Sequence, residues 1–265
     1  MRRPRAAAVL HRREPSPGRL AAVTTADLQT FLAGASVDDA VFALRPDYRA
    51  LLLAVAGLGP AAAEGDAEEL LVEAETAATA ALEAGPVEDL PHVAAWREAY
   101  RAFGAKPQRT RNSAEALLRR APKGLPRVNR LTDVYNAVSV RHQIPLGGED
   151  LTRYVGPPRL LRADGTETFE TTADGETVVE HPEPGEVVWC DAAGVTCRRW
   201  NWRQAPRTGL TPTTTSALFI LDALDPLTDE QLDAAADELV SHLLRLGGDV
   251  RVERRLLRAP AGGAA

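Results

Sequence analysis

The sequence lacks any run of eighteen or more apolar residues, so it offers no candidate for a membrane-spanning helix. It contains only two cysteines, Cys190 and Cys197, which are too few for a disulfide framework or a structural zinc site. We therefore expect two buried or half-buried thiols in a protein of the reducing cytoplasm.

Several motifs that identify common enzyme classes are also missing. No Walker loop, no GxSxG elbow and no GxGxxG between a strand and a helix occur. Of the five histidines, one is His11 in the N-terminal segment, and the other four are scattered without HxH or HxxxH spacing, at His92, His142, His181 and His242. We expect neither a metal ion nor a cofactor.

The chain is long enough for a sizeable core, and its charge is unevenly distributed. It has 265 residues, of which 45% are hydrophobic and 26% charged. The net charge is −6, yet residues 96–141 hold eleven Lys and Arg against three acids, which is +8 and leaves −14 for the remainder. A basic block inside an acidic protein is either a solvated helix face or the place where a polyanion binds.

Turn residues and periodicity divide the chain. Residues 1–20 hold six arginines and three prolines and predict a disordered basic arm, followed by a domain at 21–258 and a flexible tail at 259–265. We expect helices at 25–33, 61–84, 92–103, from 113, from 128 and at 227–247. We expect strands at 41–44, 50–56, 159–163, 186–191, 195–201, 216–223 and 250–257, with a hairpin turn at 174–175. This pattern predicts an α+β fold with an antiparallel or mixed sheet and helices packed on one side.

The stretch from Val128 to Asp150 is the most informative. Its helical part carries Asn129, Asp133 and Asn136 on one polar stripe, although Asn and Asp gain little in a helix interior. The stripe is either a solvated face or polar network, or a pocket wall that presents amides and a carboxylate to a ligand. A glycine-rich loop at residues 144–150 is expected to close over the same place.

The segment from Arg198 to Arg203, RRWNWR, is the second unusual stretch. As a strand it would place Arg199 and Asn201 on one face, and Trp200 with Trp202 on the other. Such a surface suits a stacked base of RNA, whereas a core strand with a cation–π partner is the alternative. Basic clusters flank the short helix that begins at residue 113, where phosphates would be favoured.

Residues 96–224 resemble the B3/B4 domain, the tRNA-binding and editing domain of the phenylalanyl-tRNA synthetase β subunit, and especially freestanding proteins built from that unit. The matching motifs are YRAFGAKPQRTRNSAEALLRR, NRLTDVYNAVSVRHQIPLGGED, GEVVWCD, RRWNWR and a Thr-rich segment before a strand. The resemblance implies an α+β editing fold, tRNA as the partner and hydrolysis of a wrongly esterified amino acid.

The family's site carries over at particular positions. Its Asp-x-x-Asn motif matches Asp133 and Asn136, and its Pro-x-His-x-x-Asp motif matches Pro145 and Asp150, with Gly147 at the histidine position. RRWNWR replaces a glycine-rich loop of the synthetase pocket, and a late acidic residue corresponds to Asp222. These departures leave the amino-acid preference and the catalytic contact open.

We therefore expect three groups of site residues. The catalytic candidates are Asn136, Glu149, Asp150 and Asn201. The substrate-binding candidates are Asn129, Asp133, Gly147, Gly148, Arg198, Arg199, Trp200, Thr208 and Asp222. The tRNA-binding candidates are Lys106, Arg109, Arg111, Arg119, Arg120 and Lys123.

Three functions are compatible with these residues. The first is a trans-editing factor that binds tRNA and hydrolyses mischarged aminoacyl-tRNA. The second is a non-catalytic tRNA- or RNA-binding module, which the glycine at position 147 favours. The third is a binder of a free amino acid or related small molecule.

Overall fold

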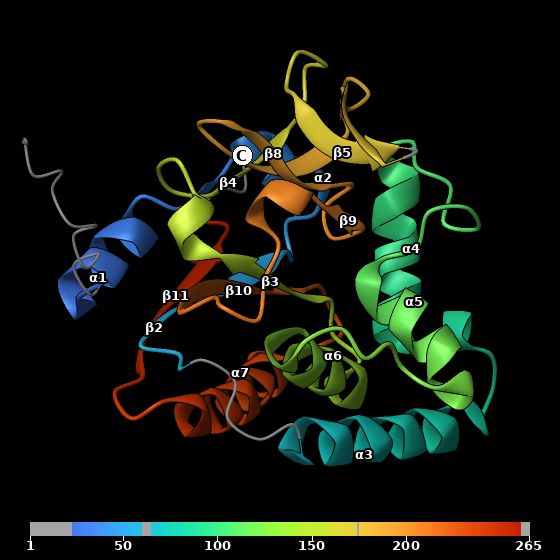
Figure 1. Ribbon diagram of the computed structural model, residues 1–265. Coiled ribbons are helices and arrows are strands. Elements are labelled where there is room, and N and C mark those ends of the chain that lie inside the picture. Colours follow the sequence, from blue (N-terminus) through green and yellow to red (C-terminus); the bar gives the residue numbers. More distant parts are fainter. Residues whose placement is uncertain (1–22, 60–64, 174, 261–265) are drawn as a thin grey trace, which may run out of the picture.

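The structure is a computed structural model that describes residues 23–59, 65–173 and 175–260 (Figure 1). The helices are α1 (Thr25–Ala33), α2 (Asp39–Leu44), α3 (Gly65–Leu82), α4 (Pro91–Ala102), α5 (Ser113–Arg120), α6 (Arg130–His142) and α7 (Asp229–Leu243). The longer strands are β2 (Arg49–Ala56), β3 (Leu146–Asp150), β4 (Arg159–Arg162), β5 (Phe169–Ala173), β6 (Glu176–Glu180), β7 (Val187–Asp191), β8 (Gly194–Arg198), β10 (Ser216–Ala223) and β11 (Arg251–Arg258). Two-residue strands, β1 (Ser36–Val37) and β9 (Arg203–Gln204), and short 3-10 turns complete the described elements.

These strands form two larger sheets and a hairpin. The four-stranded sheet has the order β11-β2-β10-β3 and is antiparallel throughout. The five-stranded sheet has the order β1-β4-β7-β8-β9 and is mixed, because β1 runs parallel to β4. Strands β5 and β6 pair only with each other. Figure 1 shows α6, α7 and α3 on one side of the four-stranded sheet and the five-stranded sheet on its other side.

Both faces of the four-stranded sheet are buried, which explains the continuous apolar run of β2. Leu51, Leu53 and Val55 point toward α6 and α7, whereas Leu52 and Ala54 point toward the second sheet and α4. Because side chains alternate along a strand, a strand covered on both faces needs apolar residues at every position. The predicted α+β class with a mixed sheet and helices against it is confirmed.

Most predicted elements are present, and three expectations are wrong. Residues 41–44 belong to helix α2 and not to a strand, because an apolar run of four residues cannot distinguish the two. Residues 146–150 form strand β3 at the sheet edge, where a loop was expected. The strand expected at 195–201 ends at Arg198. The predicted basic arm at residues 1–20 and residues 261–265 of the predicted tail lie outside the described residues.

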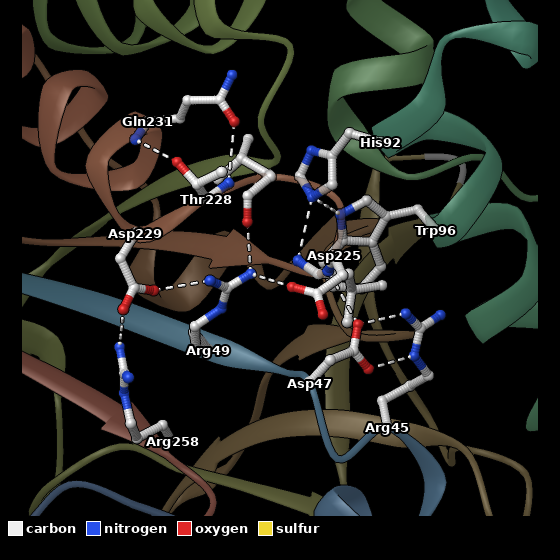
Figure 2. A network of polar contacts seen from close by, with 12 residues as sticks. Arg45, Asp47, Arg49, His92, Trp96, Asp225, Thr228, Asp229, Gln231 and Arg258 are labelled. Atoms are coloured by element: carbon white, nitrogen blue, oxygen red, sulfur yellow. Dashed lines mark hydrogen bonds and ion pairs between the residues drawn. The ribbon is translucent and has the colours of Figure 1, made fainter.

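A polar network at one end of β2 joins elements that are far apart in the sequence (Figure 2). The Arg49 guanidinium donates to Asp229 at the start of α7 and to Asp225, and Asp229 also accepts from Arg258 of β11. Nearby, the buried His92 ring accepts hydrogen bonds from the Trp96 indole. Burial lowers the pKa of His92 to about 4, so this ring is neutral at physiological pH. The network fixes α4 and α7 against the end of the sheet.

Candidate functional site

A cavity of about 270 Å³ lies at the β3 edge of the four-stranded sheet, between that sheet, the turn after β8, and helices α5 and α6. Its apolar wall contains Tyr135, Trp189, Trp200, Trp202 and Ile220. Its polar groups come from Ser113, Asn136, Glu149, Asn201, Gln204 and Asp222. The exposed Ala116 of α5 also lines it, so the cavity opens to solvent beside this helix. An apolar pocket with a few converging polar groups is the usual form of a small-molecule site.

The register of β3 determines which of its side chains reach the cavity. Glu149 pairs with Leu218 and Gly147 pairs with Ile220, so these positions share the sheet face that carries Asp222. Asp150 points to the opposite face, where its carboxylate accepts from Thr152 and Thr214. The two adjacent acids therefore have different environments, and only Glu149 lines the cavity.

Glu149 is a buried carboxyl with one strong partner. Its side chain is 2% exposed and accepts a hydrogen bond from the Tyr154 hydroxyl. Burial raises the pKa of Glu149 to about 7, although the Tyr154 hydrogen bond acts in the opposite direction. A carboxyl that titrates near neutral pH is suited to accept a proton during a reaction.

Asp222 is the second carboxyl of the cavity and belongs to a buried network. It accepts from the Tyr48 hydroxyl at 2.6 Å and from the Asn201 amide nitrogen at 3.2 Å. The Asn201 amide oxygen in turn accepts from the Tyr100 hydroxyl at 2.9 Å. Burial raises the pKa of Asp222 to about 7. Asn201 thus lies in the cavity, with both ends of its amide held by the protein.

Asn136 differs from Asn201 because its amide is not held. It lies on α6, lines the cavity and is 6% exposed, yet its side chain has no hydrogen-bond partner among the described residues. The buried hydroxyl oxygen of Ser113, at the start of α5, also lacks a partner there. A buried polar group such as the Ser113 hydroxyl is normally paired in native proteins, whereas the Asn136 amide is not among the fully buried unpaired atoms and lies at the cavity. These two groups are therefore available to a ligand.

The polar stripe expected on α6 separates into three roles. Asn129 precedes the helix as its N-cap, with its side chain accepting from the Thr132 N–H at 3.0 Å. Asp133 accepts from the Val128 N–H at 2.8 Å and so stabilises the first turn. Only Asn136 lines the cavity. The first two positions organise the beginning of the helix.

The RRWNWR segment forms a tight turn, so the expected strand alternation is wrong. Arg199 and Trp200 adopt left-handed backbone conformations with φ of 47° and 68°. Non-glycine residues in this region store strain and occur most often at functional sites. The turn buries Trp200 against Tyr48 and Trp96, and it places Trp200, Asn201 and Trp202 along the cavity.

The two arginines of this segment are engaged within the protein. Arg198 donates to both oxygens of Glu186, at 2.9 and 2.8 Å, and to Glu180. Arg199 stacks on Trp202, with its guanidinium carbon 4.6 Å from the ring centroid, and donates to Thr110. Neither arginine lines the cavity. Arg198 therefore stabilises the fold, and Arg199 stabilises the turn.

Of the remaining residues that we expected to bind substrate, some line the cavity and others lie outside it. Gly147 lines the cavity, whereas a side chain at Gly148 would contact Phe219 and Leu210 in the core. Thr208 is buried beside Gly209, which forms a backbone bridge with Glu149. The structure thus brings together Asn136, Gly147, Glu149, Trp200, Asn201 and Asp222, and it leaves the others outside the cavity.

The basic residues form two groups. Arg119 pairs with Glu88 and Glu115, and Arg111 lies 3.7 Å from Glu115, so much of their charge is compensated. Lys106 and Arg109 are exposed and line a second hollow of about 480 Å³ with Arg199. Arg120 donates to the Gly124 carbonyl, and Lys123 is exposed. The second hollow is also lined by Glu183 and Glu186, so its three basic side chains exceed its acids by one.

Some cavity residues were not anticipated. Gln204 follows the turn and Ser113 begins α5, and both line the cavity. Tyr154 does not line it but donates a hydrogen bond to Glu149. No local spacing relates these positions, because the strand pairing and the turn bring them together. Of these three residues, only Tyr154 could have been suggested by the sequence, because it lies five residues after Glu149.

The structure also bears on the two thiols, on metal binding and on membrane spans. Cys190 and Cys197 are both free and buried, as predicted. Within residues 23–59, 65–173 and 175–260, no three His, Cys, Asp or Glu side chains are grouped in a way that would hold a metal ion. None of the helices in these ranges combines the length and apolar character needed to cross a bilayer.

Comparison with known proteins gives one family. A solved N-terminal fragment of the phenylalanyl-tRNA synthetase β subunit from Pyrococcus horikoshii is 13% identical, with a TM-score of 0.42. That similarity covers 82% of this chain and 50% of the fragment, so the chain spans about half its length. No curated protein matches the chain. The B3/4 domain model matches residues 95–248, more than half of the chain and including α5, α6, β3 and β10. The protein is therefore a member of the B3/4 domain family.

Proposed function

We propose that this protein binds aminoacylated tRNA and hydrolyses the ester of a mischarged amino acid. Membership of the B3/4 family and the Asp133-x-x-Asn136 motif support tRNA as the partner. The cavity supports a small acyl group as the reacting part, because its volume of about 270 Å³ has room for an amino acid.

One observation carries the proposal: the unpartnered Asn136 amide and the Glu149 carboxyl line the same cavity. Ester hydrolysis requires a group that accepts a proton from water and a donor that stabilises the developing oxyanion. Glu149, with a pKa raised to about 7, supplies the first, and the Asn136 amide supplies the second.

In the proposed reaction, ionised Glu149 takes a proton from a water molecule while the water oxygen attacks the ester carbonyl carbon. Asn136 donates to the carbonyl oxygen as it becomes an oxyanion. The bond between the carbonyl carbon and the ribose oxygen then breaks, and the proton held by Glu149 passes to the departing ribose hydroxyl. The products are free amino acid and deacylated tRNA, and no other reactant is consumed.

The second hollow is the proposed path of the tRNA end. The turn from Arg199 to Trp202 separates it from the cavity, with Arg199 on one side and Trp202 on the other. Lys106 and Arg109 would bind phosphates without reading sequence. Arg111, Arg119, Arg120 and Lys123 remain proposed contacts to the acceptor stem.

A panel of mischarged tRNAs tests this function, with amino-acid release as the readout. Asn136→Ala is expected to reduce the rate on the order of 100-fold or more, the typical cost of losing an oxyanion donor. Glu149→Gln is expected to reduce it by at least 100-fold, because general-base catalysis contributes on this scale. Asn129→Ala is the matched control, since it removes an asparagine side chain beside the same helix but outside the cavity.

The panel also separates the other candidate functions. Salt-dependent tRNA binding without amino-acid release from any tRNA would identify a non-catalytic RNA-binding module. Binding of free amino acid without tRNA binding would identify a small-molecule binder. Equal activity of the Asn136→Ala variant and the wild type would contradict the proposed site.

A further inference from the structure

We infer that the cavity selects ligands with a cationic amino group, and that Asp222 is the counter-charge for that group. The identity of the ligand as an aminoacyl ester rests on the proposed function. The charge selection rests on the composition of the cavity wall.

The first observation is the one-sided charge of the wall. Two carboxyls, Glu149 and Asp222, line the cavity, and none of its lining residues is Lys, Arg or His. Both carboxyls are at least 97% buried. Without a basic partner, two buried acids are costly to ionise, and a cationic ligand in the same cavity would offset that cost.

The second observation is the aromatic character of the same wall. Tyr135, Trp189, Trp200 and Trp202 all line the cavity. Aromatic faces attract ammonium groups, most strongly in desolvated sites. Trp202 already binds the Arg199 guanidinium on the outside of the turn. An aromatic wall beside two acids is therefore complementary to a cation.

The third observation is the space between the two acids. Along the sheet, the pair of Gly147 and Ile220 lies between Glu149 and Asp222 on the same face. A Cβ at position 147 would lie 2.7 Å from the Gln204 side-chain nitrogen, so any side chain there would occupy the cavity wall. Glycine leaves this space to the Gln204 amide, which donates to the Gly148 carbonyl at 3.3 Å and lines the cavity between the two acids. The unpartnered Asn136 amide faces the same cavity and would bind the ester end of the ligand.

The surrounding groups do not supply another charge at neutral pH. Burial raises the pKa of Tyr135 to about 12 and raises that of Cys197 well above its usual value, so both remain neutral. Burial also raises the pKa of Tyr48 and Tyr154, which contact the two acids, and of Tyr100, which contacts Asn201, so all three are neutral. Arg207, whose charge acts on Glu149, is paired with Asp191 at 2.8 Å. An α-amino group is largely protonated at neutral pH and would provide the missing charge.

The decisive probe is a tRNA substrate in which the α-amino group is replaced by hydroxyl. The expected result is a kcat/KM roughly 10- to 100-fold lower than for the same tRNA with the intact amino acid, the usual cost of losing a hydrogen bond to a charged group. Equal hydrolysis of both substrates would overturn the inference and leave the proposed function intact. If neither is hydrolysed, the proposed function fails and the inference is tested by direct binding.

Direct binding uses calorimetry with an amino-acid methyl ester and its α-hydroxy counterpart. We expect the amine to bind roughly 10- to 100-fold more tightly. We also expect proton release near pH 6.5, detected as a heat that changes with the ionisation enthalpy of the buffer, because a bound cation favours the ionised carboxyls. Equal affinities, or a heat that is independent of the buffer, would overturn the inference.

Asp222→Asn tests the residue itself. The variant is expected to lose most of the preference for the amine over the hydroxy analogue while still binding the hydroxy analogue. Glu170→Gln removes an exposed carboxyl of β5 outside the cavity and is expected to leave the preference unchanged. An unchanged preference in a folded Asp222→Asn protein would assign the counter-charge elsewhere. The analogue comparison on wild-type protein still decides the inference if this variant does not fold.

Discussion

At the scale of single residues, the same residue type has different roles a few positions apart. Asn129 caps α6, whereas Asn136 faces the cavity without a partner. Glu149 lines the cavity, whereas Asp150 holds Thr214 on the other face of the sheet. The sequence indicated these candidate residues as a group, but it did not indicate which of them line the cavity and which stabilise the fold. That division depends on the register of β3 and on where α6 begins.

The pH dependence of stability should report the buried Glu149. Its pKa is about 7 in the folded protein against an ordinary value of 4.5, so the folded state keeps an extra proton between these pH values. The stability contributed by this proton is present below pH 4.5 and is lost as the pH rises through 7, by about 3 kcal/mol in total. Glu149→Gln has no such loss. Relative to wild type, the variant should therefore gain stability between pH 5 and pH 8 in urea unfolding.

The control for this measurement is Glu170→Gln, which removes an exposed carboxyl. Its difference from wild type should not change with pH. A Glu149→Gln difference that is equally flat would show that Glu149 is ionised in the folded protein at pH 5.

The adjacent glycines of β3 should respond differently to alanine. A Cβ at Gly148 would lie 2.8 Å from both Leu210 and Phe219, so Gly148→Ala should destabilise the fold by about 1–3 kcal/mol through overpacking. At Gly147 the new methyl would meet only the movable end of Gln204. Gly147→Ala should therefore retain stability and weaken ligand binding. Thermal unfolding and ligand titration of both variants check this, and the opposite order of stabilities would contradict the assigned register.

At the scale of elements, all the longer helices were predictable, because caps and periodicity are local signals, whereas the six-residue helix α2 was not. Asn112 caps α5 and Thr228 caps α7, in agreement with the expected helix starts. Strand β3 and the turn after β8 were not predictable in this way. Two glycines disfavour a strand, and only pairing with β10 imposes one. The left-handed Arg199 and Trp200 are stabilised by tertiary contacts with Thr110, Tyr48 and Trp96.

The N-cap of α6 gives a prediction for a whole element. Asn129→Ala should lower the free energy of unfolding by about 1 kcal/mol, because it removes the acceptor for the Thr132 N–H. The cavity residues would be unaffected, so deacylation should continue at temperatures below the unfolding transition. Chemical denaturation and the release assay measure the two effects separately. Loss of activity in a folded variant would place Asn129 in the site after all.

At the scale of the whole molecule, acidic and basic side chains gather at two neighbouring hollows. The acidic cavity and the hollow lined by Lys106 and Arg109 lie on opposite sides of one turn. The basic segment was predictable from composition, but its partial neutralisation by Glu88 and Glu115 was not, because Glu88 lies outside the basic segment. Likewise, the parallel pairing of β1 with β4 joins Ser36 to Arg159, a contact that no local pattern indicates.

Reversing the free cations tests the tRNA path. The double variant Lys106→Glu and Arg109→Glu should weaken tRNA binding uniformly across sequences. It should also reduce the slope of log affinity against log salt by about 1 to 2, because each phosphate contact contributes about 0.7–0.9. Arg159→Glu, an exposed arginine outside the basic segment, is the control. An unchanged slope in the double variant would show that the hollow makes no phosphate contacts with tRNA.

The edge position of β3 has a consequence for how this site can change over generations. The strand is bonded to a neighbour on one side only, and its two glycines place few side-chain constraints on sliding. Deleting one glycine would exchange the directions of the two acids that follow. An aspartate one methylene shorter would then enter the cavity, while the glutamate would take the place of Gly148, against Leu210 and Phe219 in the core. A single lost codon would therefore exchange the acid in the cavity and bury a carboxylate among apolar side chains, so the length of this strand constrains the site as strictly as its composition.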